Sequence, residues 1–308
     1  MKEIKNSLTI IVCSCDKYDD LWYPYFEIFK NQWKDCKYPI VLNTESKTYT
    51  HDGLKIRCLN LYKEGENVAW SDRMIETLKH IDTEYVLITL DDHFLISPVD
   101  SDKFESAFDI IKSHRRISAL SFIAFVPANE KTKWRGNFGL WKMNKYFRIN
   151  LDTAIWRKKA LVRNLRKGEN AWEFELNATE RALWDFTEYY RYKQNAEPIL
   201  DISFHLRKGY GLIRGKWCWR NPELFAKFNI PMDFNKRGYM DKEECIGYVE
   251  KENATNAEFD KKVMHKDNKC KAFLAQAKRR IPLNFRIFLS KIKRLFVRKS
   301  KDINKDEQ

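Results

Sequence analysis

Apolar runs alternate with helical patterns along the first hundred residues of the chain. Four runs are apolar or β-branched almost throughout, as buried strands are. They cover residues 8–13, 39–43, 54–58 and 84–90. Between them, apolar side chains recur at helical spacing from Leu21 to Trp33 and again over residues 70–81. Strands that alternate with helices predict an α/β fold with a parallel, Rossmann-type sheet flanked by helices.

The pattern is less regular after residue 100. It predicts helices near 102–113, 156–166 and 172–190, and strands over 118–125 and 198–204. A polar, Trp-rich stretch at 127–145 is expected to form a loop or lid, and residues 205–221 form a basic segment rich in Gly and Trp. We therefore expect one domain over residues 1–260, in two halves of about 1–100 and 101–260.

Most of the positive charge lies near the C-terminus. The net charge is +14, yet residues 261–301 hold 15 Lys and Arg against one acidic residue, so residues 1–260 are nearly neutral. A nearly neutral body argues against a nucleic-acid partner. From Ile281, apolar residues recur at 285, 288, 292, 295 and 296 with basic residues between them.

This spacing predicts a basic, amphipathic helical tail over residues 261–308. Residues 275–300 could lie on an anionic membrane surface, with the apolar side chains buried and the basic ones on headgroups. The alternative is a helix that packs on the protein body with its basic face in water. We favour the membrane surface.

Cysteine usage and hydropathy bear on the cellular compartment. Seven cysteines are scattered along the chain, and Cys13-Ser14-Cys15 has no second pair that would complete a zinc site. This usage favours reduced thiols in the cytosol. The first apolar run is too short for a signal peptide, and no run reaches 18 apolar residues. With the tail, these features predict a cytoplasmic protein held peripherally on the inner face of the cell membrane.

Two adjacent carboxylates, Asp91 and Asp92, follow the most apolar of the expected strands. Ligands of parallel α/β sheets bind beyond the carboxyl ends of the strands, so the polar loop Ser14–Asp16 and the Asp pair are expected to share one crevice. Neighbouring carboxylates repel one another, and a hard cation such as Mg²⁺ or Mn²⁺ removes the repulsion. Alternatively, one Asp caps the next turn and the other faces water.

Several motifs together resemble one family. The motifs are Thr9–Trp22, Trp70–Arg73, Tyr85–Phe94, Trp172–Glu175 and Arg214–Trp217. They are similar to motifs of bacterial GT-A-type glycosyltransferases from capsule and O-antigen gene clusters, and the resemblance spans about residues 8–220. It departs from the family at the Asp-x-Asp metal signature, because His93 occupies the third place. Which of Asp91 and Asp92 would contact a metal, and whether one is needed, stays open.

The resemblance implies a nucleotide diphosphate sugar as donor, bound by residues 1–100, and an acceptor bound by residues 101–260. Donor contacts are expected from Ser14, Cys15, Asp16, Trp70, Arg73, Asp91, Arg214 and Lys216. Metal ligands are expected at Asp91, Asp92 and His205. Arg73 could reach a phosphate, pair with Asp16 or Asp91, or form a surface ion pair.

The segment Asn170–Glu175 carries the catalytic candidates. Asn170 can cap a helix, and Glu173 and Glu175 would then point about 200° apart. Inverting sugar transfer needs one carboxylate to take a proton from the acceptor hydroxyl, and the family pattern favours Glu175 over Glu173. Both could instead serve only the helix dipole. Trp172 is expected either to stack on the acceptor sugar or to belong to the core.

The basic segment could close over the donor. Arg214 and Lys216 flank Gly215, which lets the backbone approach a phosphate closely. A flexible loop of this kind can clamp a diphosphate. His205 would be either a third metal ligand or a structural histidine.

These observations predict a glycosyltransferase that moves a sugar from a nucleotide diphosphate sugar, such as a UDP-sugar, to a glycan or lipid-linked acceptor in surface polysaccharide synthesis, assisted by Mn²⁺ or Mg²⁺. A nucleotidyltransferase also pairs carboxylates with Mg²⁺, but the sequence has no Gly-rich phosphate loop. A membrane- or RNA-binding module would use the basic tail and leave the paired carboxylates without a purpose.

Overall fold

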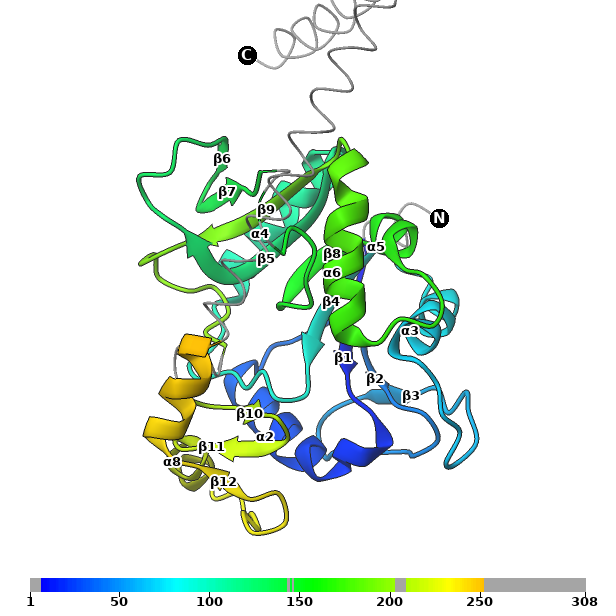
Figure 1. The fold of residues 1–308 in the computed structure, drawn as a ribbon, viewed down its shortest axis with the longest axis vertical. Coiled ribbons are helices and arrows are strands. Elements are labelled where there is room, and N and C mark those ends of the chain that lie inside the picture. The colour runs from blue at the N-terminus through cyan, green and yellow to red at the C-terminus, as the bar shows by residue number, and fades with distance from the viewer. Residues whose placement is uncertain (1–6, 143–144, 146, 203–208, 252–308) are drawn as a thin grey trace, which may run out of the picture. The chain divides into compact units, whose positions relative to one another are not determined.

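The protein is built around one large sheet. The computed structural model describes residues 7–142, 145, 147–202 and 209–251, which all belong to the first of two units, Met1–Phe259 and Asp260–Gln308. The large sheet comprises β1 (Leu8–Cys13), β2 (Ile40–Asn43), β3 (Ile56–Cys58), β4 (Tyr85–Leu90), β5 (Ile117–Val126), β6 (Trp134–Arg135), β7 (Phe138–Leu140), β8 (Ala154–Arg157) and β9 (Glu188–Lys193). The strand order is β3-β2-β1-β4-β8-β5-β9-β7-β6 (Figure 1).

The four strands of the first hundred residues are parallel, as the sequence predicts. The sheet as a whole is mixed, because β8 runs antiparallel to both of its neighbours, β4 and β5. β9 is parallel to β5, and the short hairpin β6–β7 closes that edge. The parallel arrangement predicted from the first hundred residues is thus confirmed there, and beyond β4 the sheet is mixed.

Helices cover both faces of the sheet, which gives a mixed α/β fold. They are α2 (Trp22–Gln32), α3 (Trp70–Lys79), α4 (Ser101–Ser113), α5 (Lys158–Asn164), α6 (Ala171–Arg181) and α8 (Asn221–Lys227), with 3-10 turns η1 (Asp16–Leu21) and η2 (Ala182–Trp184). Side chains of β1 alternate between the faces, as a strand requires. Ile10 and Val12 pack with α2 and α4, whereas Ile11 packs with α3, α5 and α6.

After residue 100, the observed helices and strands agree only in part with those predicted from the sequence. Helix α4 and strand β5 lie where a helix and a strand were predicted. The predicted helix at 156–166 is instead β8 followed by α5, and the predicted helix at 172–190 ends at Arg181 and gives way to β9. The predicted strand at 198–204 shows, within the described residues, a single bridge between Leu95 and Ile202.

A second, small sheet forms within the basic segment. It contains β10 (Leu212–Ile213), β11 (Lys216–Cys218) and β12 (Tyr239–Met240). β10 and β11 form a hairpin, and β12 pairs parallel to β11. In Figure 1, β4 points toward this sheet, so the small sheet lies at the carboxyl end of the parallel strands.

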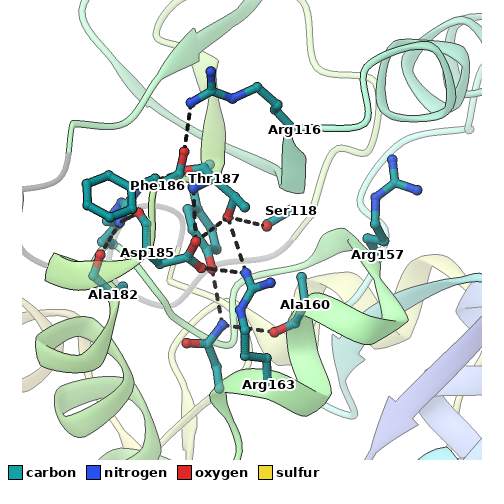
Figure 2. A network of polar contacts seen from close by, with 12 residues as sticks. Arg116, Ser118, Arg157, Ala160, Arg163, Ala182, Asp185, Phe186 and Thr187 are labelled. Carbon is teal, nitrogen blue, oxygen red and sulfur yellow. Dashed lines mark hydrogen bonds and ion pairs between the residues drawn. The ribbon is translucent and has the colours of Figure 1, made fainter. Parts of the chain in front are cut away.

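A polar network fixes the turn between η2 and β9 (Figure 2). The Asp185 carboxylate accepts hydrogen bonds from Thr187 N at 2.9 Å and from an Arg163 guanidinium nitrogen at 2.6 Å. Burial raises the pKa of Asp185, but these hydrogen bonds outweigh burial and hold the pKa below its ordinary value. Arg116 donates to the carbonyl of Phe186 at 2.9 Å, while the Phe186 side chain is 67% exposed. The network lies at the amino end of β9, opposite the edge described below.

The predictions about membrane spans and cysteines can be compared with the described residues, whereas two others lie outside them. Among the described residues, no helix has the length and apolar character needed to cross a membrane. The six cysteines in this part are free thiols. The predicted basic tail, residues 261–308, and the predicted metal ligand His205 both lie outside the described residues.

Candidate functional site

The carboxyl ends of β1, β2 and β4 bring three loops together. Cys13 pairs with Asn43 of β2 and with Leu90 of β4. The ladder continues one residue further, because Asp91 N donates to Cys13 O and Ser14 N donates to Asn43 O, both at 3.2 Å. The loop after β1 and the carboxylate pair therefore meet at one edge of the sheet, although Ser14 and Asp91 are 77 residues apart in sequence.

Asp91 is held in a position almost closed to solvent, with 8% of its surface exposed. Ser14 Oγ donates to Asp91 Oδ2 at 2.5 Å and accepts from Trp22 Nε1 at 2.7 Å. Burial and the negative charge of the adjacent Asp92 raise the pKa of Asp91 to about 8. A cation at this edge would favour the ionised form of both carboxylates.

Asp92 connects the large sheet to the small one. Leu212 N donates to Asp92 Oδ2 at 3.1 Å. The preceding residue, Gly211, has φ +77°, and a Cβ at this position would stand 3.0 Å from Asp92 O. The buried Asn221 amide exchanges two hydrogen bonds with the Gly211 backbone, at 2.9 and 2.7 Å. Strand β10 is thereby fixed against the carboxylate pair.

His93, the third residue of the carboxylate motif, is buried. Its Nδ1 lies 3.0 Å from Thr153 Oγ1, which in turn lies 3.0 Å from Thr89 Oγ1. Burial lowers the pKa of His93 to about 4, against the opposing charge of Asp152, so the imidazole is neutral at pH 7. The third position of the Asp91-Asp92-His93 motif is thus a neutral, buried ring.

The residues at this edge fit a hard divalent cation. Over the described residues, no group of three or more His, Cys, Asp or Glu side chains is arranged as a metal site. Mg²⁺ is usually bound through one or two carboxylates, with water and substrate phosphates completing its coordination. Asp91 and Asp92 offer two carboxylates at one edge, which suits an ion of this kind that a diphosphate would also coordinate.

Arg73 forms a buried ion pair with a residue that the sequence analysis missed. It is 5% exposed, pairs with Glu45 and donates to Ser14 O at 2.7 Å. Glu45 also accepts from Asp16 N at 2.5 Å. The partner is neither Asp16 nor Asp91, and the pair is not at the surface. Glu45 follows β2 as Ser14 follows β1, so the rule on the carboxyl ends of strands would have found it.

Asp16 binds the loop after β2. Its carboxylate accepts from Ser46 N at 2.9 Å, from Ser46 Oγ at 2.6 Å and from Lys47 N at 3.2 Å. Burial raises the pKa of Asp16, but these hydrogen bonds outweigh it and lower the pKa. Cys15 is half-buried, and its carbonyl accepts from Tyr18 N at 2.9 Å. The donor contact expected from Asp16 would thus be shared with loop contacts that the sequence did not predict.

A second missed residue, Arg237, adds positive charge beside the carboxylates. It precedes β12, donates from Nε to Asp20 Oδ2 at 2.6 Å and lies 4.4 Å from the centre of the Tyr18 ring. Its charge lowers the pKa of Asp91, against the larger effects of burial and Asp92. No sequence pattern marks Arg237, because it belongs to an irregular loop that only the tertiary fold brings to this edge.

The predicted phosphate clamp forms the turn of the small sheet. Arg214 and Gly215, with φ of +51° and +80°, connect the paired residues Ile213 and Lys216. The Arg214 guanidinium lies 5.2 Å from the ring centre of Tyr248, and both Arg214 and Lys216 are exposed. A Cβ on Gly215 would lie 3.9 Å from the Tyr18 hydroxyl, so the turn stands next to η1.

Glu175 and Glu173 have different surroundings. Glu175 Oε1 accepts from Leu151 N at 2.7 Å, on the segment that enters β8. That segment reaches the same edge as Asp91, because β8 runs antiparallel to β4. Glu173 forms a capping box with Asn170 at the start of α6. The two residues exchange hydrogen bonds and stabilise the start of α6, a contact beyond the helix dipole considered from the sequence.

Trp70 and Trp172 also differ. The Trp70 ring lies 5.0 Å from the ring of Phe174 and packs on the core between α3 and α6. Trp172 is 46% exposed at the first turn of α6, so it is not a core residue.

A further carboxylate, Asp152, was missed by the sequence analysis. It lies 3.7 Å from Arg191, and its negative charge raises the pKa of His93 against the larger effect of burial.

No protein-family model and no curated protein matches this chain by sequence. Among solved structures, S. aureus TarS 1-349 is similar with a TM-score of 0.43 and 13% identity, over 75% of this chain and 68% of that one. The match covers 41% of a longer S. aureus TarS chain.

The names of two further similar structures state an activity. Mannosyltransferase PcManGT from Pyrobaculum calidifontis, in complex with GDP-Man and Mn²⁺, has a TM-score of 0.41 and 14% identity, over 94% of this chain and 80% of that one. A nucleotidyl transferase from Methanothermobacter has a TM-score of 0.37 and 13% identity, over 62% and 88%. Similarity at this level is shared by proteins with different activities, so the residues of the site itself carry the functional proposal.

Proposed function

We propose that this chain is a glycosyltransferase that moves a sugar from a nucleotide diphosphate sugar, such as a UDP-sugar, to a glycan or lipid-linked acceptor of surface polysaccharide synthesis. The supporting observation is the meeting of Asp91 and Asp92 with the loop that begins at Ser14. Open α/β sheets bind ligands at the carboxyl edge where the strand order reverses. In this sheet the order reverses between β1 and β4, the two strands that carry these residues.

The donor would lie over this edge with its diphosphate toward the carboxylate pair. A bound Mn²⁺ or Mg²⁺ would supply positive charge to offset the charge that develops on the leaving diphosphate. Asp91 is oriented for this role by Ser14, and Asp92 by Leu212. Arg237 adds a fixed positive charge at the same edge.

The loops around the edge would form the rest of the donor site. The ion pair of Arg73 with Glu45 holds the Ser14–Asp16 loop against the loop after β2, where the base and ribose would bind. The turn at Arg214 and Lys216 stands next to η1 and would supply further positive charge to the diphosphate. The predicted ligand His205 would add to the cation site.

The acceptor would approach from the side of α6. Glu175 is the proposed general base, which takes a proton from the acceptor hydroxyl as the hydroxyl attacks the sugar with inversion. Its carboxylate is anchored through Leu151 N at the edge that also carries Asp91. Trp172 lies one helical turn before Glu175 on the same face of α6, where it would contact the acceptor.

A panel of UDP-, GDP- and CMP-sugars, each tested for thermal stabilisation with and without Mn²⁺, examines this proposal. We expect one nucleotide class to raise the melting temperature only when Mn²⁺ is present, and Asp92→Asn to remove that effect. If no nucleotide sugar stabilises the protein, the proposal fails. Stabilisation by a nucleoside triphosphate, with release of pyrophosphate on addition of a sugar phosphate, would favour nucleotidyl transfer instead.

We also propose that the chain works at the inner face of the cell membrane. The support is the excess of Lys and Arg over residues 261–301 beside an almost neutral remainder. The full chain should sediment with vesicles that contain anionic phosphatidylglycerol at low salt, and should be released as salt screens the charges. Equal binding to neutral phosphatidylcholine vesicles would contradict an electrostatic tether.

A further inference from the structure

Two pairs of aromatic side chains lie between the end of β5 and the start of α6. We call Phe125, Trp141, Phe147 and Trp172 the aromatic surface. The rings of Phe125 and Trp141 are 5.6 Å apart and nearly perpendicular, and so are those of Phe147 and Trp172. Trp172 is 46% and Phe125 37% exposed, whereas Trp141 is buried. Large rings left in water beside buried ones indicate a surface built for contact.

Arg191, on β9, links the first pair of rings to the backbone of Phe147. Its guanidinium lies 5.0 Å from the ring centre of Phe125 and 4.7 Å from that of Trp141. It donates to the carbonyl of Phe147 at 2.5 Å and lies 3.7 Å from Asp152. Arg191 is only 4% exposed, so it supports the aromatic surface from within.

Phe147 has a backbone conformation that bulky residues avoid. Its φ is +45°, in the left-handed region, where a Cβ is crowded by the following carbonyl. The hydrogen bond from Arg191 to the Phe147 carbonyl holds this conformation. Strained residues that the surrounding structure maintains are concentrated at ligand sites. The strain therefore points to a role for the Phe147 ring beyond packing.

The aromatic surface adjoins the proposed catalytic carboxylate. Strands β4 and β5 both run opposite to β8, so their carboxyl ends lie at the same edge. Trp172 and Glu175 share one face of α6, and Glu175 binds Leu151 N just ahead of Asp152. A molecule stacked on Trp172 would therefore present its groups near Glu175.

We propose that the aromatic surface binds pyranose rings of a carbohydrate acceptor, an assignment that rests on the proposed function. The flat C–H face of a pyranose packs on an aromatic ring, and its hydroxyls need polar partners at the rim. The aromatic surface offers both, because the Lys145 amine lies 5.5 Å from the ring centre of Trp141 and the Asp152 carboxylate lies beside Arg191. β-Linked sugars with equatorial hydroxyls have the flattest faces, so they are the favoured class.

Binding of free oligosaccharides tests the proposal without any transfer reaction. The probes are chitotriose, cellotriose and maltotriose at about 10 mM, a concentration that detects millimolar affinities, followed by saturation-transfer difference NMR. We expect at least one of the two β-linked probes to bind the wild type better than maltotriose does. Trp172→Ala and Phe125→Ala should each weaken binding about fivefold or more. Loss of one aromatic side chain that stacks on a base has an effect of this size in complexes with single-stranded nucleic acids.

Phe186→Ala is the matched control. Phe186 is also an exposed phenylalanine, but it lies at the opposite end of the strands, in the network of Figure 2, and its loss should leave binding unchanged. Phe147→Gly removes a ring while suiting the positive φ, so it should lose binding without a large fall in melting temperature. Wild-type protein that binds none of the three probes, or Trp172→Ala and Phe125→Ala proteins that bind them normally, would overturn the proposal.

A parallel titration with the nucleotide sugars and Mn²⁺ separates the two proposals. If the protein binds an oligosaccharide but no nucleotide sugar, the aromatic surface is a carbohydrate site and the transferase proposal fails. If it binds a nucleotide sugar but no oligosaccharide, the donor site stands and the aromatic surface has another role. In the active enzyme, Phe125→Ala should raise KM for the acceptor and leave KM for the donor unchanged.

Discussion

Replacing Gly211 by Ala tests whether the small sheet holds Asp92 in place. Gly211 has φ +77°, where an alanine costs about 1–2 kcal/mol. The new Cβ would also stand 3.0 Å from Asp92 O and 3.3 Å from Asp92 Oδ2, so the contact between Leu212 N and Asp92 must lengthen. Loss of a hydrogen bond to a charged group removes about 1.5–3 kcal/mol. We therefore expect Gly211→Ala to lower the free energy of unfolding by about 2.5–5 kcal/mol.

Gly65→Ala separates the two contributions. Gly65 has φ +76°, and a Cβ at this position would meet no atom within 4 Å, so the variant carries only the cost of the left-handed backbone. In thermal melts at pH 7, Gly211→Ala should unfold about 3–12 °C below Gly65→Ala, from about 2–4 °C for each kcal/mol. Gly211→Ala should also weaken Mn²⁺-dependent donor binding. Equal melting temperatures for the two variants would refute the contact with Asp92.

Three further changes test the site and the fold. Asp92→Asn should abolish sugar transfer with little change in melting temperature, and wild-type turnover in excess EDTA would contradict the metal role. Glu175→Gln should lower kcat by about 10²–10⁴, whereas Glu173→Gln should retain activity; the reverse order would put the base on the other face of α6. Asp185→Asn should be less stable than wild type at pH 7 in urea titrations. The folded-state pKa of Asp185 lies below its ordinary 3.8, so its stabilisation is present above that pH and lost as pH falls through the folded value; a gap unchanged at low pH would argue against an ionised Asp185.

The parallel half of the fold could be predicted because its strands are long and continuously apolar. The run Tyr85–Leu90 has no competing helical reading, and its polar end follows directly in Asp91. Strand β8 could not be predicted in the same way. Its apolar core is three residues long, and the apolar residues of α5 resume at Ala160, one helical turn after Trp156, so the whole stretch reads as one helix.

Residues of the candidate site could be predicted from the sequence only where they directly follow a parallel strand. Ser14 and Asp91 follow two adjacent strands, so a rule about strand ends brings them together, and the same rule applied to β2 would have added Glu45. Arg237 and Asp152 follow no strand end of the parallel set. Arg237 reaches the edge through an irregular loop, and Asp152 through the reversal at β8, which only the folded chain reveals.

Because β8 runs in the reverse direction, sequence changes next to α6 are separated from sequence changes in the loops around Asp91. The segment ahead of β8 arrives at the edge that carries Asp91 from the opposite direction to the loops after β1, β2 and β4. Substitutions at residues 147–151, which contact α6, would therefore reshape the side next to α6 and leave the loops around Asp91 as they are. Under the proposed function, related chains that use one donor for different acceptors should differ most in this stretch, and exchanging it between them should transfer acceptor choice alone.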